Sequence, residues 1–496
     1  MFGKIKSFLF ENKTTKQTIA KNTVWLSISN FGGRLIKAGV IIYGARVLGT
    51  AEWGVFSYTL TISGFLALFM DPGINGILIR DASKASGEEL NRLFSTTLAI
   101  KIFLLLIGVS LILFVAPAIT KLPGANALFP IVAIILMLDT LRDFFSSLVR
   151  AMEKMELDAG IFLLTNLGIL VFGFLLLREM PTAISFGWGY VLGDLLGVAL
   201  SVFLLRNYFK KIFSSFSSKL VMPIVQSAWP FAVSGALGLL FTNTDILIIG
   251  WMRSASEVGI YSAAIRIIQI LYLIPMILQF STLPLLSRLA KSDNVKFRAV
   301  LEQTLAFVFL ASIPLALGGI ILGTDIMSFV FGSPYRAGGL SFQLLSMTLL
   351  FDFAASIIVN ALFAYEHQKS LIVSSALGGG TNVIFDLLLI PHFGIAGSAV
   401  ATLIAQAVNN SYLWYAMKKV NYFSVIPQLK KIFFASVIMA AITFALSQIG
   451  LPVAMNILLS IGVYLGLLQL LKEPAFIEIK KVLLPDKEIH AAESNQ

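Results

Sequence analysis

The chain has 496 residues, of which 57% are hydrophobic and 13% charged, and its formal net charge at pH 7 is +11. No soluble domain of this length has such a composition, so we expect a polytopic, all-α integral membrane protein. The chain contains no Cys, which excludes disulfides, thiol catalysis and Cys-ligated metals. Its three His lie far apart in the sequence and in no ligand motif, so no metal site is expected.

Apolar stretches of about 20 residues predict fourteen transmembrane helices, joined by short loops. Their limits are 23–45, 54–79, 93–116, 127–149, 159–177, 183–205, 225–251, 259–285, 300–322, 339–363, 370–391, 394–417, 432–450 and 452–471. With a cytoplasmic N-terminus, 27 of the 37 Lys and Arg residues fall on the cytoplasmic side, five on the opposite side and five inside spans. This asymmetry predicts that both termini are cytoplasmic, and it accounts for the basic charge without a nucleic-acid partner.

Short matches at a constant offset indicate an internal repeat. Residues 52–58 (EWGVFSY) resemble residues 257–263 (EVGIYSA) at an offset of 205, and further matches follow in the same order at an offset of 213. We therefore expect a cytoplasmic tail (1–22), an N-lobe of spans 1–6 (23–216), a C-lobe of spans 7–12 (217–418), spans 13–14 (419–471) and a cytoplasmic tail (472–496). Because each lobe has an even number of spans, both lobes enter the membrane in the same direction, and a cavity between them is expected.

A polar stripe runs along the first predicted span. Asn30, Arg34 and Lys37 recur at helical spacing and share one face. A cation near the bilayer centre costs about 2.5–3.5 kcal/mol, so such residues usually face a cavity or a partner. The first span holds no acid to pair with these cations, which favours an anionic substrate. In the second half, Arg266 and Gln269 share a face and are candidates for the same role.

Embedded carboxylates and amides form a second group of candidates. We expect them to bind a coupling ion or to line the cavity, and the alternative is that each only joins neighbouring helices. Asp139, Arg142 and Asp143 are spaced for a self-contained structural ion pair, and Asp71-Pro72-Gly73 interrupts an apolar span. The candidates for ion coupling or cavity lining are Asp71, Asp245, Asp352, Asn360, Asn382 and Asp386.

The chain has no P-loop, no Rossmann fingerprint, no G-x-S-x-G and no H-E-x-x-H motif. ATP hydrolysis and a bound cofactor are therefore not expected. Transport energy would come from an H⁺ or Na⁺ gradient, the membrane potential or the substrate gradient.

Four stretches resemble a known family. They are RVLGTAEWGVFSY from Arg46, SEVGIYSAAIRI from Ser256, FGSPYRAGGLSFQLLS from Phe331 and HFGIAGSAVATLIAQ from His392. They look like segments of Wzx-like polysaccharide repeat-unit flippases, which form the polysaccharide transporter family of the multidrug/oligosaccharidyl-lipid/polysaccharide exporter (MOP) superfamily. The resemblance covers residues 20–470.

The resemblance implies a MATE-like fold of two six-helix lobes that alternate between inward-open and outward-open states. It implies a transporter rather than an enzyme, with a polyprenyl-diphosphate-linked oligosaccharide as its substrate and O-antigen, capsule or exopolysaccharide assembly as its role. Arg34 and Lys37 would then bind the diphosphate, with help from Arg266. The expected setting is a prokaryotic plasma (inner) membrane, where the chain is a monomer that contacts membrane lipids and the polysaccharide polymerase machinery.

Three alternatives remain at this point. A lipid II flippase also uses a cationic cavity. An ion-coupled multidrug exporter would bind a cation at Asp71 or Asp245 and would not need Arg34. A membrane glycosyltransferase or polymerase generally needs a large external loop carrying acids, and the longest predicted outer connection, 322–339, is short and holds only Asp325.

Overall fold

The computed structural model describes residues 15–209 and 215–483. Within these residues every regular element is a helix, in agreement with the predicted all-α class. The chain divides into two compact units, which are described separately below: a first unit, Met1–Ala263, and a second unit, Ala264–Gln496.

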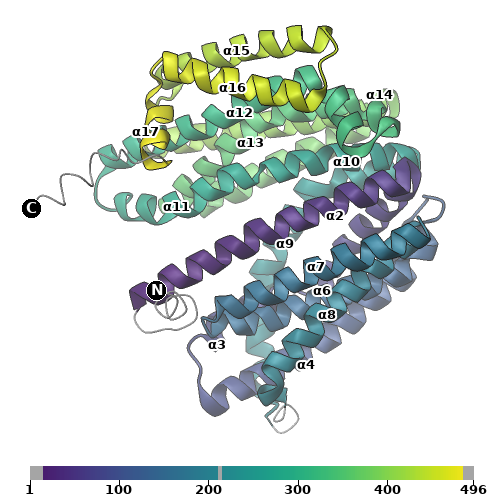
Figure 1. Ribbon diagram of the computed structural model, residues 1–496. Helices are drawn as coiled ribbons and strands as arrows, with labels where there is room; N and C mark the ends of the chain where they lie inside the picture. The colour runs from purple at the N-terminus through teal and green to yellow at the C-terminus, as the bar shows by residue number, and fades with distance from the viewer. Residues whose placement is uncertain (1–14, 210–214, 484–496) are drawn as a thin grey trace, which may run out of the picture. The chain divides into compact units, whose positions relative to one another are not determined.

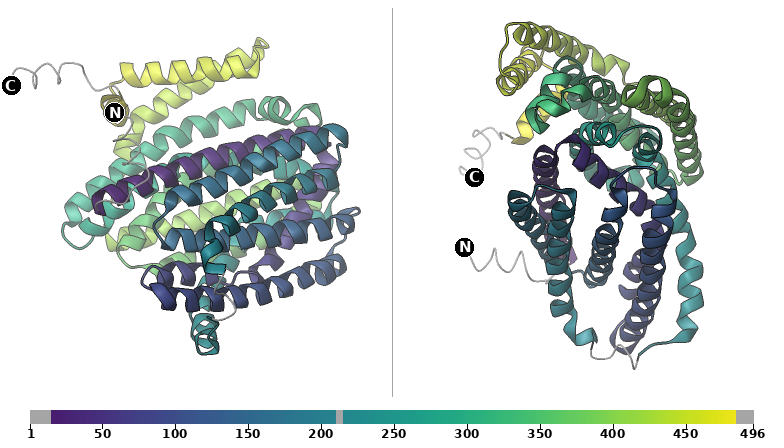
Figure 2. Two further views of the ribbon diagram at one scale, coloured as in Figure 1. Left: turned by 60° about the horizontal axis from the view of Figure 1, so that its bottom comes forward. Right: turned by 90° about the vertical axis from the view of Figure 1, so that its right-hand side faces the viewer.

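In the first unit, the helix α2 packs along α7, α7 packs along α8, and α8 packs along α6 (Figures 1 and 2). The first unit contains α2 (Thr15–Leu66), a 3-10 turn (Ala67–Phe69), α3 (Ile74–Ala82), α4 (Gly87–Ser110), a π-helical turn (Leu111–Val115), α5 (Ala116–Ile119), α6 (Ala125–Ala151), α7 (Met155–Glu179), α8 (Ala183–Phe209), α9 (Ser218–Met252) and most of α10 (Ala255–Leu271).

In the second unit, α12 and α13 pack together, α13 packs on α14, and the pair α15–α16 packs on α12 (Figure 1). Its elements after the end of α10 are α11 (Leu273–Leu289), α12 (Asn294–Phe331), a 3-10 turn (Ser333–Gly338), α13 (Gly339–Ala364), α14 (Gln368–Val420), α15 (Ile426–Gln448), α16 (Val453–Leu470) and α17 (Pro474–Leu483).

Two long helices each supply two of the predicted spans. α2 has 52 residues and is kinked at Gly49 (φ 71°, ψ 179°), while α14 has 53 residues and is kinked at Gly394 (φ 57°, ψ −138°). Only glycine adopts these angles readily, so each kink divides a helix into two arms. Among the described residues, ten helices are long and apolar enough to cross a membrane, or eleven with the bent pair that ends at Ala82. With the two kinks and α6 taken into account, twelve of the fourteen predicted segments coincide with a helix or an arm, and 54–79 and 259–285 each cover two successive helices.

The boundary between the units differs from the predicted boundary between the lobes. The repeat places it at 216/217, whereas the packing places it inside α10, between Ala263 and Ala264. The physical reason is that α9, the seventh predicted span, packs against α2, α3 and α4. Compactness and repeat symmetry are different criteria, so the division into two six-helix lobes stays a prediction of the repeat.

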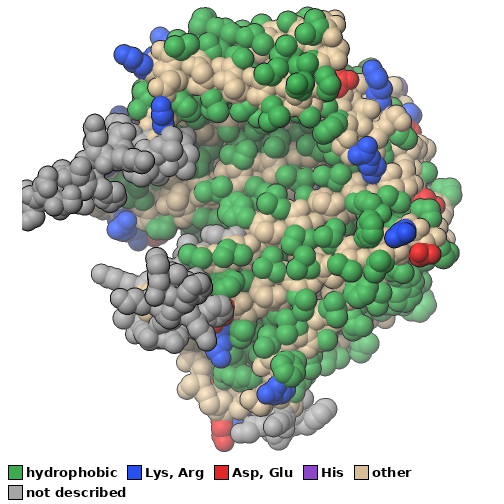
Figure 3. Space-filling view, viewed as in Figure 1, with side chains coloured by type: hydrophobic (Ala, Val, Ile, Leu, Met, Phe, Trp, Pro, Cys, Tyr) green, Lys and Arg blue, Asp and Glu red, His purple; other side chains and the backbone are tan. Residues whose placement is uncertain are grey.

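The outer surface has the composition expected of a membrane protein. Hydrophobic side chains cover most of the face that Figure 3 draws, and Lys, Arg, Asp and Glu lie mainly toward its edges. Large apolar side chains are exposed along the helices, for example Phe114 at 76% and Leu458 at 70%. Water would oppose such exposure, whereas a lipid environment accepts it.

Repeat-equivalent residues contact each other within the first unit. A Cβ on Gly54 would lie 1.8 Å from the Ala255 carbonyl oxygen, and one on Gly259 would lie 1.9 Å from the Thr50 carbonyl oxygen. Ser262 Oγ donates a hydrogen bond of 3.2 Å to Ser57 Oγ. The second arm of α2 and the start of α10 therefore cross with their backbones in contact, which only small residues allow.

Candidate functional site

The first arm of α2 carries the predicted cationic stripe. Arg34 and Lys37 are both exposed, and the side chain of Asn30 lies outside the described residues. Gly33, next to Arg34, packs so closely on α7 that a Cβ there would lie 2.1 Å from a carbon of the Phe162 ring. The stripe is thus held rigidly beside α7 while its two cations remain accessible to a ligand.

The structure places acids near this stripe that the first span itself lacks. The positive charge of Lys37 acts on the carboxylates of Asp139 in α6 and Asp194 in α8. Asp139 is 50% exposed and is ion-paired with Arg142, whose side chain is 8% exposed. The Arg142 guanidinium also lies 5.6 Å above the ring of Phe162. Arg142 is therefore a buried cation held by its neighbours, whereas Arg34 and Lys37 remain the accessible cations of this region.

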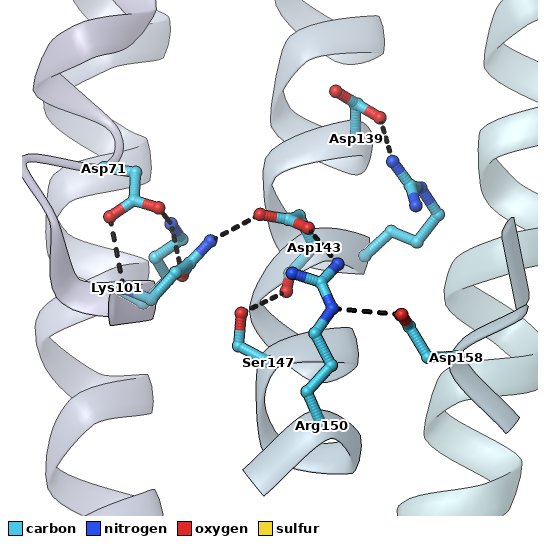
Figure 4. A network of polar contacts seen from close by, with 9 residues as sticks. Asp71, Lys101, Asp139, Asp143, Ser147, Arg150 and Asp158 are labelled. Atoms are coloured by element: carbon cyan, nitrogen blue, oxygen red, sulfur yellow. Dashed lines mark hydrogen bonds and ion pairs between the residues drawn. The ribbon is translucent and has the colours of Figure 1, made fainter. Parts of the chain in front are cut away.

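A chain of polar contacts crosses the first unit from α3 to α7 (Figure 4). Lys101 of α4 is fully buried, and its Nζ lies 3.3 Å from Asp71 Oδ2. The same Nζ donates to Asn75 Oδ1 at 3.2 Å, and Asn75 Nδ2 donates to Asp143 Oδ2 at 2.9 Å. Buried charges need such partners, so these contacts fix the interrupted span onto α4 and α6.

The chain continues through Arg150 at the end of α6. Arg150 Nη2 lies 2.9 Å from Asp143 Oδ1, and Arg150 Nε donates to Asp158 Oδ2 at 3.0 Å (Figure 4). A second buried pair joins the same region to α2, since Lys21 Nζ lies 2.8 Å from Glu156 Oε2. Charged pairs thus tie α2, α6 and α7 together.

The break at Asp71-Pro72-Gly73 has a defined local cause. Asp71 Oδ1 accepts hydrogen bonds from the backbone N–H groups of Gly73 (3.0 Å) and Asn75 (3.3 Å). Gly73 has φ 106°, and a Cβ there would lie 2.4 Å from Phe231 Cβ of α9. The carboxylate therefore caps α3, and glycine is required both by the backbone angle and by the close approach of α9.

The predicted structural ion pair needs one correction. Arg142 pairs with Asp139 as the spacing suggests, and the charge of Asp143 also acts on Arg142, but the direct contacts of Asp143 are with Arg150 and Asn75. Residues seven apart in a helix lie on the same face, two turns from each other. Asp143 and Arg150 are so spaced, and the long Arg150 side chain spans the distance. Asp71 likewise does not stand alone as an ion site, because its carboxylate already holds Lys101 and the start of α3.

In the second unit, polar residues lie on both sides of the junction between α10 and α11. Arg266 Nη1 donates to Gln269 Oε1 at 2.8 Å, so the two predicted substrate-binding residues contact each other. Tyr272, at the junction, donates its hydroxyl to Asp352 of α13. The predicted cavity-lining residue Asp352 is thus bound to a tyrosine.

Two further contacts join α11 to the same face of α13. Gln279 Nε2 donates to the Ser356 carbonyl at 3.0 Å, and Asn360 Nδ2 donates to the Gln279 carbonyl at 3.0 Å. The predicted stripe of Asp352, Ser356 and Asn360 therefore faces α11. All of these side chains keep partial exposure, so the face joins two helices without being fully buried between them.

The remaining candidate carboxylates bond hydroxyl groups. Tyr261 donates to Asp245 at 2.5 Å within the first unit. Ser398 donates to Asp386 at 2.8 Å within the second unit, where Asn382 Nδ2 lies 3.4 Å from Asp386 Oδ2. Sequence reasoning did not assign the partners of these candidates, which are Asn75, Lys101, Arg150, Tyr261, Tyr272 and Ser398. Of these partners, Lys101 is the one that the sequence could most readily have indicated, because a cation in an otherwise apolar span requires a partner.

Two family models match the chain. The model described as "Polysaccharide biosynthesis protein" matches residues 19–290, and the MatE model matches residues 230–388.

Curated relatives match most of the chain. The probable low-salt glycan biosynthesis flippase Agl15 of Haloferax volcanii is 26% identical over 458 residues, which is 91% of this chain and 94% of that protein. A putative O-antigen transporter of Shigella flexneri is 22% identical over 77% of this chain and 94% of its own length. Among solved structures, the inward closed conformation of the lipid II flippase MurJ has a TM-score of 0.73 and 20% identity, and the match covers 90% of this chain and 98% of that one.

Proposed function

Because the chain belongs to the polysaccharide biosynthesis protein family, we propose that it is a flippase for lipid-linked oligosaccharides. It is a multi-pass membrane transporter of the MOP superfamily with a MATE-like fold, and it serves surface-polysaccharide assembly rather than catalysing a reaction. The observation that carries this function is the match to glycan flippases and O-antigen transporters along nearly their whole length.

The site chemistry supports a diphosphate as the anchor of the substrate. Arg34 and Lys37 are exposed cations three residues apart, and a diphosphate accepts charge-assisted hydrogen bonds from both. We assign these two residues, with Asn30, to the polyprenyl diphosphate, and Arg266 and Gln269 to the same substrate. Asp139 and Asp194 lie close enough for the charge of Lys37 to act on them, so these acids offset part of the positive charge of the region.

We also propose the cellular setting and the energy source. The protein resides in a prokaryotic plasma (inner) membrane with both termini in the cytoplasm, acts as a monomer and delivers its product to the polysaccharide polymerase machinery. Transport is by alternating access and is coupled to H⁺ or Na⁺ through embedded carboxylates such as Asp245 and Asp386. Imposed pH and Na⁺ gradients across proteoliposomes test the coupling, because uncoupled transport would respond to neither.

The decisive experiment is mass analysis of lipid-linked sugars in cells depleted of this protein. The expected result is a build-up of one polyprenyl-diphosphate oligosaccharide whose sugars are accessible only from the cytoplasmic side. A build-up of lipid II would instead assign the chain to peptidoglycan assembly. Unchanged lipid-linked sugars with raised sensitivity to cationic dyes would assign it to drug export.

A further inference from the structure

The apolar span formed by α10 and α11 has a one-residue break in its interior, at Tyr272 (φ −65°, ψ −9°). The two helices together make one span of 35 residues, yet α10 ends at Leu271 and α11 begins at Leu273. Pro275 lies in the first turn of α11, where it cannot donate a hydrogen bond to the preceding turn. An interruption at membrane depth is tolerated only where the backbone is buried in protein or lines a hydrated cavity.

The equivalent span of the other repeat is also interrupted, a few residues further along, between Phe69 and Ile74. The 205-residue offset aligns Tyr272 with Ala67, the first residue of the 3-10 turn that ends the second arm of α2. That span then bends by 52° before α3. Interrupted apolar segments at corresponding positions of two repeats indicate substrate sites in transporters.

The two interruptions differ in their chemistry. The first is surrounded by charges, with Asp71 and Lys101 in contact. Beside the second, the face between α11 and α13 carries an aromatic ring, two amides and one carboxylate, and Arg266 with Gln269 precedes it in α10. Tyr272 donates to Asp352, and Gln279 and Asn360 each donate through their side-chain amides to a backbone carbonyl across the α11–α13 seam.

The second interruption keeps hydrogen-bonding capacity for a ligand. The side-chain carbonyl oxygens of Gln279 and Asn360 accept no hydrogen bond from any residue that the structure describes, and both side chains are partly exposed. Tyr272 is also partly exposed, and its ring is fixed because its hydroxyl is held by Asp352. A fixed aromatic ring beside planar polar groups matches a neutral ligand that has both an apolar face and many hydroxyls.

We propose that Tyr272, Gln279, Asp352 and Asn360 form the wall that binds the sugar units of the substrate. This inference rests on the proposed function and assigns the glycan to a surface separate from the cations of α2. The C–H face of a pyranose ring packs on Tyr272, and its hydroxyls donate to the free amide oxygens of Gln279 and Asn360. The diphosphate needs cations, and none of these four residues is one; Arg266 precedes Tyr272 by six residues and stays assigned to the diphosphate.

Binding to the purified protein in nanodiscs tests the assignment with two probes. One probe is the polyprenyl-diphosphate oligosaccharide fraction extracted from depleted cells, and the other is undecaprenyl diphosphate, which has no sugar. Tyr272→Ala should weaken binding of the oligosaccharide probe about tenfold, the effect of truncating an aromatic anchor, and leave the sugar-free probe unchanged. Gln279→Met, which keeps length but removes the amide, should weaken only the oligosaccharide probe, by roughly fivefold.

Matched variants separate binding from folding. Tyr272→Phe keeps the ring and should retain most of the affinity. Tyr365→Ala removes another tyrosine of the second unit, one whose hydroxyl donates to Asn294 Oδ1, and should alter neither affinity. Equal losses for both probes in Tyr272→Ala, or no loss at all in Tyr272→Ala and Gln279→Met, would overturn the proposal. If the wild-type protein binds both probes equally, the glycan contributes nothing to affinity and the wall is not a sugar site, whereas failure to bind either probe would contradict the proposed function itself.

Discussion

Removing either partner of the Lys101–Asp71 pair should destabilise the protein by different amounts. Asp71→Asn leaves a fully buried ammonium without its carboxylate, and breaking a buried pair in this way costs about 3–5 kcal/mol. Lys101→Met leaves a carboxylate that is 23% exposed and still accepts two backbone hydrogen bonds. The second change should therefore cost only about 1–2 kcal/mol. The double variant should be more stable than Asp71→Asn alone, because it removes the orphaned charge.

Equilibrium unfolding in detergent with increasing SDS measures these differences for the wild type and the three variants. Lys291→Met serves as the control, because its ion pair with Glu366 joins side chains that are 74% and 72% exposed. Such a surface pair contributes at most about 1 kcal/mol. If Lys101→Met were the more destabilising change, or if the two single effects simply added, the ammonium would not depend on Asp71 and the reasoning would fail.

Three further outcomes are expected. Arg34→Ala should abolish flipping of the lipid-linked oligosaccharide in reconstituted vesicles at normal expression, whereas Arg34→Lys should retain part of it; normal flipping by the alanine variant would remove Arg34 from the site. Gly54→Ala should lower the thermal midpoint because its Cβ would overlap the Ala255 carbonyl, whereas Gly39→Ala, with no atom within 4 Å, should not. Asp293 caps α12, and hydrogen bonds from backbone N–H groups hold its pKa below the usual value. The cap therefore stabilises the helix start fully above the pKa of the unfolded state, and this stabilisation is lost as pH falls through the pKa of the folded state. The protection factors of the amides at the start of α12, which correct for the intrinsic pH dependence of exchange, should fall over that window, and in Asp293→Ala they should be low at every pH.

Much of the fold follows from hydropathy and glycine positions. Each predicted span is helical, in one piece or in two successive helices, because an isolated apolar stretch of span length satisfies its backbone groups in lipid only as a helix. The kinks at Gly49 and Gly394 were not predicted, since many glycines occur in these helices and only the backbone angles distinguish the two. The packing of α9 against α2, α3 and α4 could not be predicted either, because sequence periodicity does not say which neighbouring helix an apolar face contacts.

The sequence predicted which charged residues lie within the membrane, but not which residues they contact. The sequence identified Arg34, Lys37 and the embedded carboxylates, which the cost of charge in lipid makes conspicuous. It did not identify the partners, because Asp71 and Lys101 are 30 residues apart and belong to different spans. Tyr272 was missed for another reason: an isolated tyrosine in an apolar span gives no signal until its hydroxyl partner is known.

The two interrupted spans explain why Asp71 is a poor candidate for binding a coupling ion. Its carboxylate lies at the N-terminus of α3, where the helix dipole and two N–H groups stabilise negative charge, and Lys101 adds a full positive charge. A proton or Na⁺ would have to displace that ammonium, which would then be buried and unpaired. Asp71 therefore has a structural role: it holds the start of α3 and binds Lys101. The second interruption has no such charge pair among the contacts described, and its polar groups retain capacity for a ligand.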